Sequence, residues 1–573
     1  MASHGHQAGF FLSFATFISP PMDATAPFLL YVLLLFIVLS SHIGLALMFR
    51  KAGESAWKAF VPGLNYYTWV RLLDKGIGWF IAMLVPILNV VAWLILAADS
   101  TRRFDRHGFW DGVLAMAFPY VYFPWLGTTD KARYISEADA AKKPRPAGRE
   151  WADAAAFALI AATTVRMFFF EAYTIPTTSM EGSLLAGDFL FVSKFHYGPR
   201  VPMTPLAIPF LHQRIPVLGA KAYLDKPAFP YWRMPGFQRV KRNDVVVFNW
   251  PEGDTIFNPF GSTRSYYDFQ REFEDKAFYQ DQDIVNLLNR QPSLPYATPG
   301  TLRPGKDLIT AYPVDKRENY IKRCVGVPGD LVEMRRGELW VGGKTALKPR
   351  DMQHRYRIDL QPNQYLPLDF LKKELRLNVT SGETEIASMR QNREGKQMIS
   401  GTVFVQADSS QAERLRERPE ILRMSRAGRI GDDPTATFPH DARFPGNVDN
   451  FGPITVPGKG ATVTITEANL PIYARIINVF EASEYAGAAY PAFRKRIAAG
   501  ESIPYTFSMD YYLMMGDNRH QSQDGRYWGF VPEDHVLGKA WFVWWSWEVG
   551  IPIWQKIGTL RLNRLVSPVR HGK

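Results

Sequence analysis

Cysteine is almost absent from this chain of 573 residues, in which Cys324 is the only one. A single cysteine forms no internal disulfide, and no His-Glu-x-x-His pair or paired-cysteine motif is present to hold zinc. Cys324 lies in an apolar, strand-like run, where a small buried residue is the favoured interpretation. The sequence therefore predicts that the protein uses no metal and no cofactor, and it argues against thiol chemistry.

Charged residues are missing from Phe28 to Phe49. At about 1.5 Å per residue, an apolar run of this length crosses a hydrocarbon core of roughly 30 Å, so it predicts a transmembrane helix. Further apolar runs lie at 78–98, 109–127 and 151–173, and we interpret them as membrane segments too. Proline and polar residues interrupt the second and third runs, so re-entry into the membrane is an alternative to crossing for both.

Basic residues indicate the orientation of these runs, because short basic loops tend to stay in the cytoplasm. They gather in the connections 50–75 and 131–149, which are therefore predicted to lie inside. Everything after residue 173 is then expected on the outer, periplasmic side of a bacterial inner membrane. Arg102, Arg103 and Arg106 do not fit four full crossings, which would place them outside. A re-entrant hairpin that keeps their turn inside is the alternative.

The formal net charge of +12 is open to two explanations, nucleic acid or an anionic lipid surface. Many of the lysines and arginines in the first third of the chain flank the apolar runs. We therefore expect membrane lipid as a partner, and we expect no nucleic acid.

After residue 173 the pattern changes to short alternating strands separated by glycine and proline, as in Asp188–Ser193, Asp244–Asn249 and Glu338–Val341. Two long polar stretches, 254–318 and 345–505, interrupt these strands and are interpreted as insertions. The second includes helix-like pieces such as 411–418. The sequence predicts a mainly β domain, α-helical transmembrane segments before it, and α+β insertions.

Three stretches far apart in the chain carry the candidate chemistry, namely 175–180, 320–330 and 516–526. The first places Ser179 just after the fourth apolar run, and the second contains Lys322 among apolar neighbours. A serine hydroxyl is a weak nucleophile unless an adjacent base removes its proton. Lysine serves as that base only when it is neutral, and burial against apolar residues favours the neutral form. The stretches therefore indicate a membrane-tethered serine protease.

In sequence and order, these motifs resemble the type I signal peptidase family, the bacterial leader peptidases. The resemblance covers about 170–253, 319–344 and 506–547, whereas the insertions and the region before 130 lie outside it. It implies an antiparallel β fold of the signal-peptidase kind and the removal of signal peptides from secretory preproteins at small-x-small sites. The translocation machinery is a further partner that it suggests.

The resemblance also assigns roles to residues of this chain. Ser179 is the implied nucleophile and Lys322 the implied general base, while the backbone N–H of Ser179 and the hydroxyl of Thr177 would form the oxyanion hole. Ser522 would orient Lys322. The other supporting residues are Asp524, Arg526, Arg323 and Gly516. Asp524 and Arg526, two positions apart, are favoured as a structural ion pair rather than as direct participants.

These motifs also divide the chain into segments. We expect a polytopic membrane region at 1–130, a basic cytoplasmic linker at 131–150 and a transmembrane anchor at 151–173. The catalytic domain would then comprise 174–253, 319–344 and 506–573, the last with an aromatic C-terminal tail, and the insertions 254–318 and 345–505 would separate its parts.

Several alternatives remain open at the level of sequence. A triad of Ser179 and His520 with an acid is conceivable, although the lysine motif explains more residues. A membrane-bound regulatory Ser-Lys protease of narrow specificity, or a non-catalytic membrane assembly factor, would retain the same motifs. The Gly342–Thr345 segment suggests a hairpin turn rather than a phosphate loop. A tryptophan cluster near the C-terminus suits either a lipid interface or core packing, and consists of Trp541, Trp544, Trp545, Trp547 and Trp554.

Overall fold

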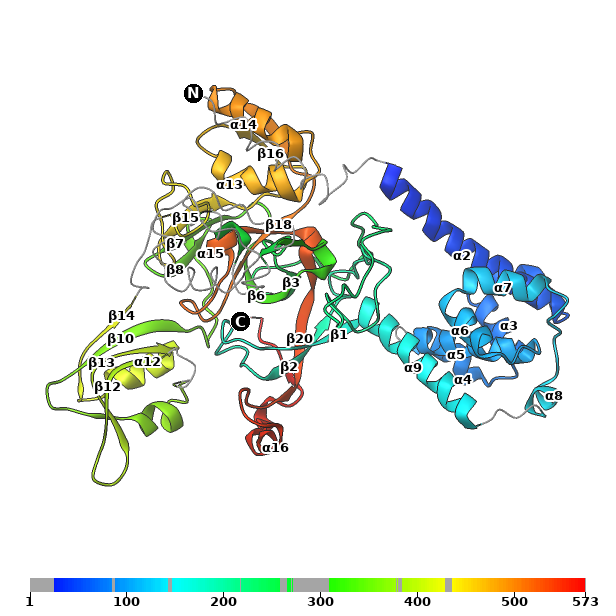
Figure 1. The fold of residues 1–573 in the computed structure, drawn as a ribbon, viewed down its shortest axis with the longest axis horizontal. Helices are drawn as coiled ribbons and strands as arrows, with labels where there is room; N and C mark the ends of the chain where they lie inside the picture. The colour runs from blue at the N-terminus through cyan, green and yellow to red at the C-terminus, as the bar shows by residue number, and fades with distance from the viewer. Residues whose placement is uncertain are drawn as a thin grey trace. The chain divides into compact units, whose positions relative to one another are not determined.

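The computed structural model describes residues 25–84, 88–142, 147–216, 218–257, 265–268, 271, 309–377, 379, 384–427 and 435–571 (Figure 1). The chain forms two compact units. A helical unit holds Met22–Glu171 together with Pro199–Met234, and a β unit holds Ala172–Gly198 together with Pro235–Lys573. Most of the expected insertion 254–318 lies outside the described residues.

The helical unit is built from short helices around a shared apolar core, to which Phe49, Trp69, Leu96 and Phe123 belong. Trp69 is buried there and donates from its indole Nε1 to Ser100 Oγ at 2.8 Å. The elements are α2 (Thr25–Lys51), η1 (Ala56–Phe60), α3 (Leu64–Leu72), α4 (Ile77–Leu84), α5 (Leu88–Arg103), α6 (Phe109–Ala117), α7 (Pro119–Thr128), α8 (Glu137–Ala141) and α9 (Ala147–Phe168).

The four apolar runs fold differently from one another. The first lies within α2, a helix of 27 residues. The second is divided between α4 and α5, and the third is broken at Phe118 into α6 and α7 because Pro119 has no N–H to continue the preceding helix. Among residues whose side chains the structure describes, one helical stretch is long and apolar enough to cross a membrane, Glu150–Phe168 in α9.

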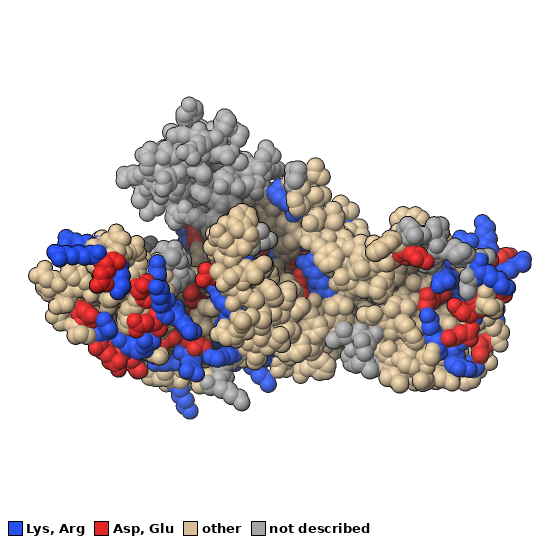
Figure 2. All heavy atoms as spheres, turned by 90° about the horizontal axis from the view of Figure 1, so that it is seen from below, with Lys and Arg blue, Asp and Glu red and all other residues tan. Residues whose placement is uncertain are grey.

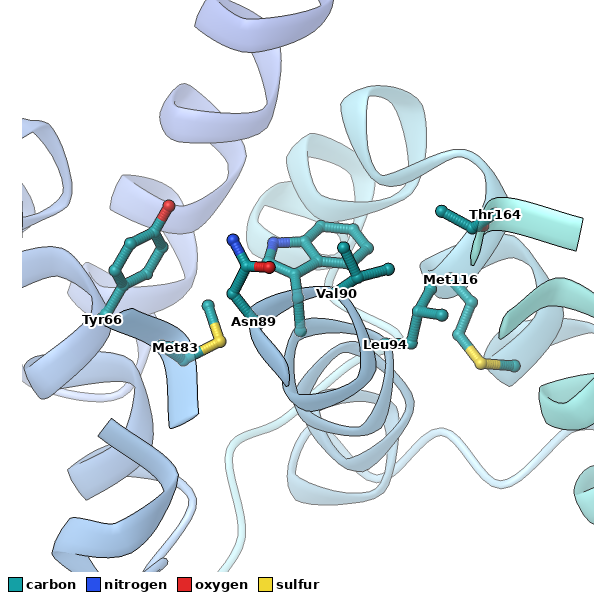
Figure 3. A pocket seen from close by; sticks show the side chains of 8 residues that line it. Tyr66, Met83, Asn89, Val90, Leu94, Met116 and Thr164 are labelled. Carbon is teal, nitrogen blue, oxygen red and sulfur yellow. The ribbon is translucent and has the colours of Figure 1, made fainter. Parts of the chain in front are cut away.

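A cavity of roughly 250 Å³ lies inside the helical unit (Figure 3). Its walls come from α3, α4, α5, α6 and α9, and the side chains that line it are mostly apolar. Among the polar lining residues, Asn89 has a buried Oδ1 with no hydrogen-bond partner in the described part of the chain. The full lining is Tyr66, Met83, Asn89, Val90, Trp93, Leu94, Met116 and Thr164.

The β unit is organised around one antiparallel sheet whose strands follow the order β1-β2-β20-β3-β6-β18-β19, with β21 paired to β20. Alternating apolar residues explain these strands, and β2 coincides with the predicted Asp188–Ser193. The strands are β1 (Phe170–Thr174), β2 (Asp188–Ser193), β3 (Val245–Asn249), β6 (Asn319–Gly326), β18 (Tyr511–Met515), β19 (Phe530–Pro532), β20 (Val536–Ser546) and β21 (Ser567–Pro568). The mainly antiparallel β prediction is confirmed for this part of the chain.

A second sheet, in the order β15-β7-β8-β9, packs with short helices into the largest apolar core of the β unit. The predicted hairpin at Gly342–Thr345 is confirmed, because β8 and β9 pair across Gly342 and Gly343, which both have positive φ. The elements are β7 (Leu331–Arg335), β8 (Glu338–Val341), β9 (Lys344–Thr345), β15 (Phe451–Thr455), β16 (Thr462–Ile465), α13 (Leu470–Arg475), η7 (Ile476–Phe480), η8 (Gly487–Ala489), α14 (Tyr490–Ala498), β17 (Ile503–Thr506) and α15 (Gly525–Trp528).

Part of the long insertion forms an α+β layer with its own apolar core, in which strands pair in the order β11-β13-β10-β14 and β12 joins β13. Its elements are β10 (His354–Leu360), β11 (Leu366–Pro367), η6 (Phe370–Glu374), β12 (Glu385–Gln391), β13 (Gln397–Ala407), α12 (Ser409–Arg416) and β14 (Ile421–Arg426). The remaining elements are β4 (Thr255–Phe257), β5 (Ile309–Ala311), η5 (Val314–Lys316), η9 (Glu533–His535), α16 (Ile553–Lys556), η10 (Ile557–Thr559) and η11 (Leu562–Arg564).

Candidate active site

Ser179 lies in the connection between β1 and β2. Two backbone hydrogen bonds close this connection at its base, from Ile175 N to Asp188 O and from Gly187 N to Ile175 O, each 2.8 Å long. Met180 and Leu184 have no exposed surface and pack against valines of β2 and β3. Because these anchors lie on both sides of it, Ser179 is held in place although it belongs to a loop.

Lys322 comes from the middle of β6 and meets this serine. It pairs with Val246 of β3, so the strand position is fixed by the sheet. Its Nζ donates to Ser179 Oγ at 2.6 Å, which brings together two residues from sequence stretches that lie far apart. Both side chains are largely shielded from water, because Lys322 is 3% exposed and Ser179 is 9% exposed.

Burial changes the chemistry of this lysine. Desolvation lowers the pKa of Lys322 from 10.5 to about 8, while the negative charges of Asp524 and Asp517 oppose that effect. No carboxylate among the described residues forms an ion pair with Lys322. The aromatic ring of Tyr320 lies 5.6 Å from its Nζ. A neutral Lys322 is therefore accessible near neutral pH, as a general base requires.

The third stretch begins where β18 ends, beside the same two residues. Met515 pairs with Arg323, so Gly516 follows at the level of Lys322. A Cβ atom at Gly516 would lie 2.2 Å from Ser522 Oγ and 2.5 Å from the carbonyl oxygen of Ser179. Only a residue without a side chain allows this close approach.

Ser522 lies close to the serine and lysine, but its hydrogen bond is not the one implied by the resemblance. Its Oγ donates to the carbonyl oxygen of Gln523 at 3.4 Å. Within the described part of the chain, no hydrogen bond joins it to Lys322. The structure thus places Ser522 against Gly516 without a direct contact to the amine.

Asp524 and Arg526 form a fully buried ion pair with two hydrogen bonds, of 2.9 and 2.7 Å. The second Asp524 oxygen also accepts from the backbone N–H of Gly516 at 3.0 Å. Burial alone would raise the pKa of Asp524, but the charge of Arg526 and these hydrogen bonds keep it below its usual value. The pair therefore fixes the loop that carries Gly516 rather than contacting Ser179.

Two residues of the third stretch were not singled out in the sequence. Asp517 accepts two hydrogen bonds from Arg323, at 2.8 and 2.6 Å, with both side chains almost completely buried. Asn518 donates from its backbone N to the carbonyl oxygen of Ser179 at 3.2 Å and from its side chain to Thr178 O at 3.3 Å. In the sequence, only their position next to Gly516 could have indicated that these two residues belong to the site.

The two groups that the resemblance implies for an oxyanion hole are the hydroxyl of Thr177 and the backbone N–H of Ser179. The hydroxyl oxygen of Thr177 is 3.5 Å from Ser179 Oγ, and Thr177 is exposed. Among the described residues, no acceptor binds the backbone N–H of Ser179. The Thr177 hydroxyl is thus exposed to solvent beside Ser179 Oγ.

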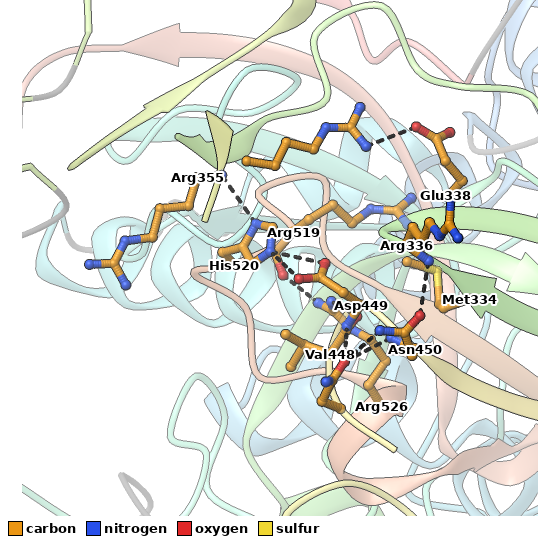
Figure 4. A network of polar contacts seen from close by, with 12 residues as sticks. Met334, Arg336, Glu338, Arg355, Val448, Asp449, Asn450, Arg519, His520 and Arg526 are labelled. Atoms are coloured by element: carbon orange, nitrogen blue, oxygen red, sulfur yellow. Dashed lines mark hydrogen bonds and ion pairs between the residues drawn. The ribbon is translucent and has the colours of Figure 1, made fainter. Parts of the chain in front are cut away.

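His520 belongs to a different network, which joins the insertion to the core (Figure 4). Its Nδ1 accepts from the backbone N–H of Arg355 at 3.1 Å, and its Nε2 lies 3.0 Å from an Asp449 oxygen. With both ring nitrogens bound in this way, His520 is not the base beside Ser179. In the described part of the chain, no three His, Cys, Asp or Glu side chains are grouped so as to hold a metal ion.

The predicted tryptophan cluster is only partly buried. Trp541, Trp544 and Trp554 are exposed, and Trp544 and Trp547 pack edge-on against Phe189. Core packing alone therefore does not account for the whole cluster.

A serine hydroxyl bound to a buried lysine on an antiparallel β scaffold is the arrangement expected of a serine hydrolase with a lysine base. The chain belongs to the family described as signal peptidase, peptidase S26, which matches residues 148–412 and 455–545. Residues 57–137 of the helical unit match a second family, DUF5684, whose function is unknown.

Individual relatives match over shorter stretches. The signal peptidase I of Buchnera aphidicola subsp. Schizaphis graminum is 52% identical over 56 residues, which cover 9% of this chain and 18% of that protein. The Aquifex aeolicus signal peptidase I is 44% identical over 50 residues, 9% and 20% of the two chains. That of Pseudomonas fluorescens is 32% identical over 95 residues, 14% and 34%. These matches therefore span about a third or less of each relative.

Proposed function

We propose that this protein is a membrane-bound serine endopeptidase that removes signal peptides from secreted preproteins, with Ser179 as nucleophile and Lys322 as general base. The observation that carries the proposal is the 2.6 Å hydrogen bond between Lys322 Nζ and Ser179 Oγ in a buried setting. Membership in the signal peptidase family supports the same reaction.

In the first step, neutral Lys322 accepts the hydroxyl proton of Ser179 while Oγ attacks the carbonyl carbon of the scissile bond. The protonated amine then gives that proton to the departing amine nitrogen, and an acyl group remains on Ser179. Water attacks the ester with Lys322 again as base, which releases the acid product and restores the serine. No cofactor takes part in these proposed reaction steps.

The oxyanion of each tetrahedral intermediate would accept from the backbone N–H of Ser179 and from the hydroxyl of Thr177. Donors positioned in this way typically contribute about 3–4 kcal/mol to stabilising the transition state. Arg323, Gly516, Asp524, Arg526 and Ser522 act indirectly, by holding the loop and strand that present the pair.

Substrate and location follow from the chain order. Ser179 comes shortly after α9, so the site would lie near the outer surface of a bacterial inner membrane, with α2 and α9 in a multi-pass membrane region. Secretory preproteins present a small-x-small cleavage site at that surface while their apolar segment is still in the lipid. The translocation machinery that delivers them is the expected partner there.

The test is cleavage of a secretory preprotein with an Ala-x-Ala site by the purified full chain in detergent and lipid. Ser179→Ala and Lys322→Ala should each abolish cleavage, and the product termini read by mass spectrometry should follow the second alanine. Matched controls are Ser388→Ala and Lys396→Ala, which remove an exposed serine and lysine from the insertion and should leave the rate unchanged.

Loss of cleavage in the controls as well would point to a folding defect rather than to chemistry. Cleavage by Ser179→Ala at the wild-type rate, or no cleavage of any preprotein by the wild type, would contradict the proposal. The latter result would favour the regulatory-protease and assembly-factor alternatives.

A further inference from the structure

The helical unit has no role in the proposed chemistry, and its segment 57–137 matches a family of unknown function. The sequence alone leaves two arrangements for the runs 78–98 and 109–127, crossing or re-entry. The contacts inside this unit distinguish between them.

The first run folds into an antiparallel hairpin. Lys75, which precedes α4, pairs with Asp99 near the end of α5 at 2.8 Å. Asp74 pairs with Arg103, the last residue of α5, at 2.9 Å. The beginning of α4 and the end of α5 therefore lie at one level, and the two helices run antiparallel.

The second run also folds back on itself. Tyr122 of α7 donates its hydroxyl to Asp111 of α6 at 2.7 Å, although a continuous helix would separate these residues by about 16 Å along its axis. The guanidinium of Arg106, before α6, lies 5.4 Å from the ring centre of Trp125 in α7. Both ends of the α6–α7 pair thus approach the end of α5.

Helix α2 shows how deep these hairpins reach. It runs parallel to α7, because Ser40 Oγ donates to Tyr120 O at 2.6 Å and Lys51 Nζ donates to Leu126 O at 3.1 Å. Gly44 permits this approach, since a Cβ there would lie 2.5 Å from Pro124. The stretch from Ser40 to Lys51 rises by about 16 Å, roughly half of a 30 Å hydrocarbon core. With Lys51 at the membrane surface, Ser40 and the start of α7 beside it lie near the middle of a bilayer.

Charge and exposure follow the same axis. No Asp, Glu, Lys or Arg occurs within 77–98 or 112–129. Lys and Arg side chains gather with Asp and Glu at the right-hand end of the face shown in Figure 2. Along the hairpins, apolar side chains are exposed instead, including Ile81 at 55% and Val121 at 60%. Water disfavours such surfaces, whereas lipid accepts them.

We infer that α4–α5 and α6–α7 are two re-entrant hairpins. Both enter and leave the membrane on the side where the charged residues lie, and both reach into that leaflet alone. The partner of this surface is the acyl region of that leaflet, with lipid headgroups around the basic residues. Of the described helices of this unit, α2 and α9 alone then cross the membrane. This arrangement places Arg102, Arg103 and Arg106 on the same side as Lys51 and Lys131 and removes their conflict with the distribution of basic residues.

The cavity of Figure 3 fits this arrangement, because both hairpins and α9 contribute to its walls. Thr164, from the later half of α9, lines it together with Met83 near the end of α4 and Asn89 near the start of α5. The end of α4 and the start of α5 therefore lie at the level of Thr164, about 16 Å along α9 from Asp153, the last acidic residue before it.

The test compares the membrane side of three engineered cysteines in living cells. His107→Cys marks the connection between the hairpins, Lys131→Cys marks the segment after them, and Glu394→Cys marks an exposed turn of the β unit. The native Cys324 is completely buried, so the wild-type chain provides the unlabelled reference. A membrane-impermeant maleimide is added before or after permeabilisation, and labelling is read as a mass shift.

Re-entrant hairpins predict that His107→Cys labels together with Lys131→Cys and opposite to Glu394→Cys, whichever way the protein is oriented. Labelling of His107→Cys together with Glu394→Cys would show four crossings and overturn the inference. Arg102→Cys provides a second marker of the same connection if His107→Cys fails to accumulate. The readout is independent of catalysis, so failure here leaves the proposed function unaffected.

Discussion

The surroundings of Lys322 and those of Arg323 differ sharply, although these residues follow each other on β6 and leave the strand on opposite sides. Both side chains are buried, with exposures of 3% and 1%. Arg323 meets the carboxylate of Asp517 through two hydrogen bonds. Lys322 meets a serine hydroxyl and an aromatic ring instead.

This difference shows what each cation is for. Arginine stays charged in proteins, so its burial requires a carboxylate, and the Arg323–Asp517 pair ties β6 to the loop after β18. A lysine without such a partner responds by lowering its pKa, which costs stability but provides a base. The chain thus places a structural cation and a chemical one side by side.

Replacing Lys322 tests the chemical half of the comparison and should have the largest effect. Lys322→Met removes the base, and we expect preprotein cleavage to fall by a factor of about 10⁴ or more. Lys322→Arg should be equally inactive, because a guanidinium cannot lose its proton at neutral pH. The rate of product formation over several hours measures both.

The Lys322→Met variant should remain folded. The pKa of Lys322 in the fold, about 8, lies below its ordinary 10.5, so folding favours the neutral form. The burial of charged Lys322 therefore lowers the free energy of unfolding by its full amount below pH 8, and this loss disappears above pH 10.5. Lys322→Met should therefore melt at or above the wild-type temperature at pH 7, and a clear decrease would mean that Lys322 has a structural role.

Replacing Arg323 tests the structural half. Arg323→Met leaves the Asp517 carboxylate buried without its cation, and we expect the free energy of unfolding to decrease by about 3–5 kcal/mol. Tryptophan fluorescence during heating in detergent should show a lower melting temperature. The double variant Arg323→Met/Asp517→Leu should recover much of the loss, and a single variant as stable as wild type would refute the assignment.

Sequence reasoning recovered the elements whose pattern is local. The strands at Asp188–Ser193 and Glu338–Val341 were predicted at their observed bounds, because alternating apolar residues determine them. The motifs also led to Ser179 and Lys322, whose contact is now seen, while their chemical roles remain a proposal.

Contacts between distant segments were beyond the reach of these patterns. Nothing in the periodicity shows that Arg103 pairs with Asp74, or that Asp517 supports Arg323, since each depends on how helices or strands pack. The motif also did not determine the hydrogen-bond partner of Ser522, which is the Gln523 carbonyl oxygen instead of Lys322. A serine hydroxyl can reach different partners in different rotamers.

Gly516 joins the two surroundings, since it lies at the level of Lys322 and precedes Asp517. Gly516→Ala would place a Cβ 2.5 Å from the Ser179 carbonyl oxygen, which must move with its loop. A displacement near 1 Å typically reduces the rate by about 10²-fold, so we expect a reduction of this size in kcat/KM. Gly558→Ala is the matched control, because nothing lies within 4 Å of a Cβ there. An unaffected Gly516→Ala rate would mean that the loop tolerates this shift.

The pH dependence of cleavage is the mildest test of the contrast, because it perturbs Lys322 without changing the chain. With a pKa of about 8, only the neutral fraction of Lys322 accepts the Ser179 proton, so kcat/KM should rise with pH and level off above 9. At pH 7 the rate should be about one tenth of the plateau, since one pH unit changes the neutral fraction nearly tenfold. Samples held at each pH and then assayed at pH 8 separate titration from unfolding. A value of kcat/KM that stays unchanged from pH 6 to 9 would show that no group with this pKa controls the reaction. It would also remove the distinction between Lys322 and Arg323.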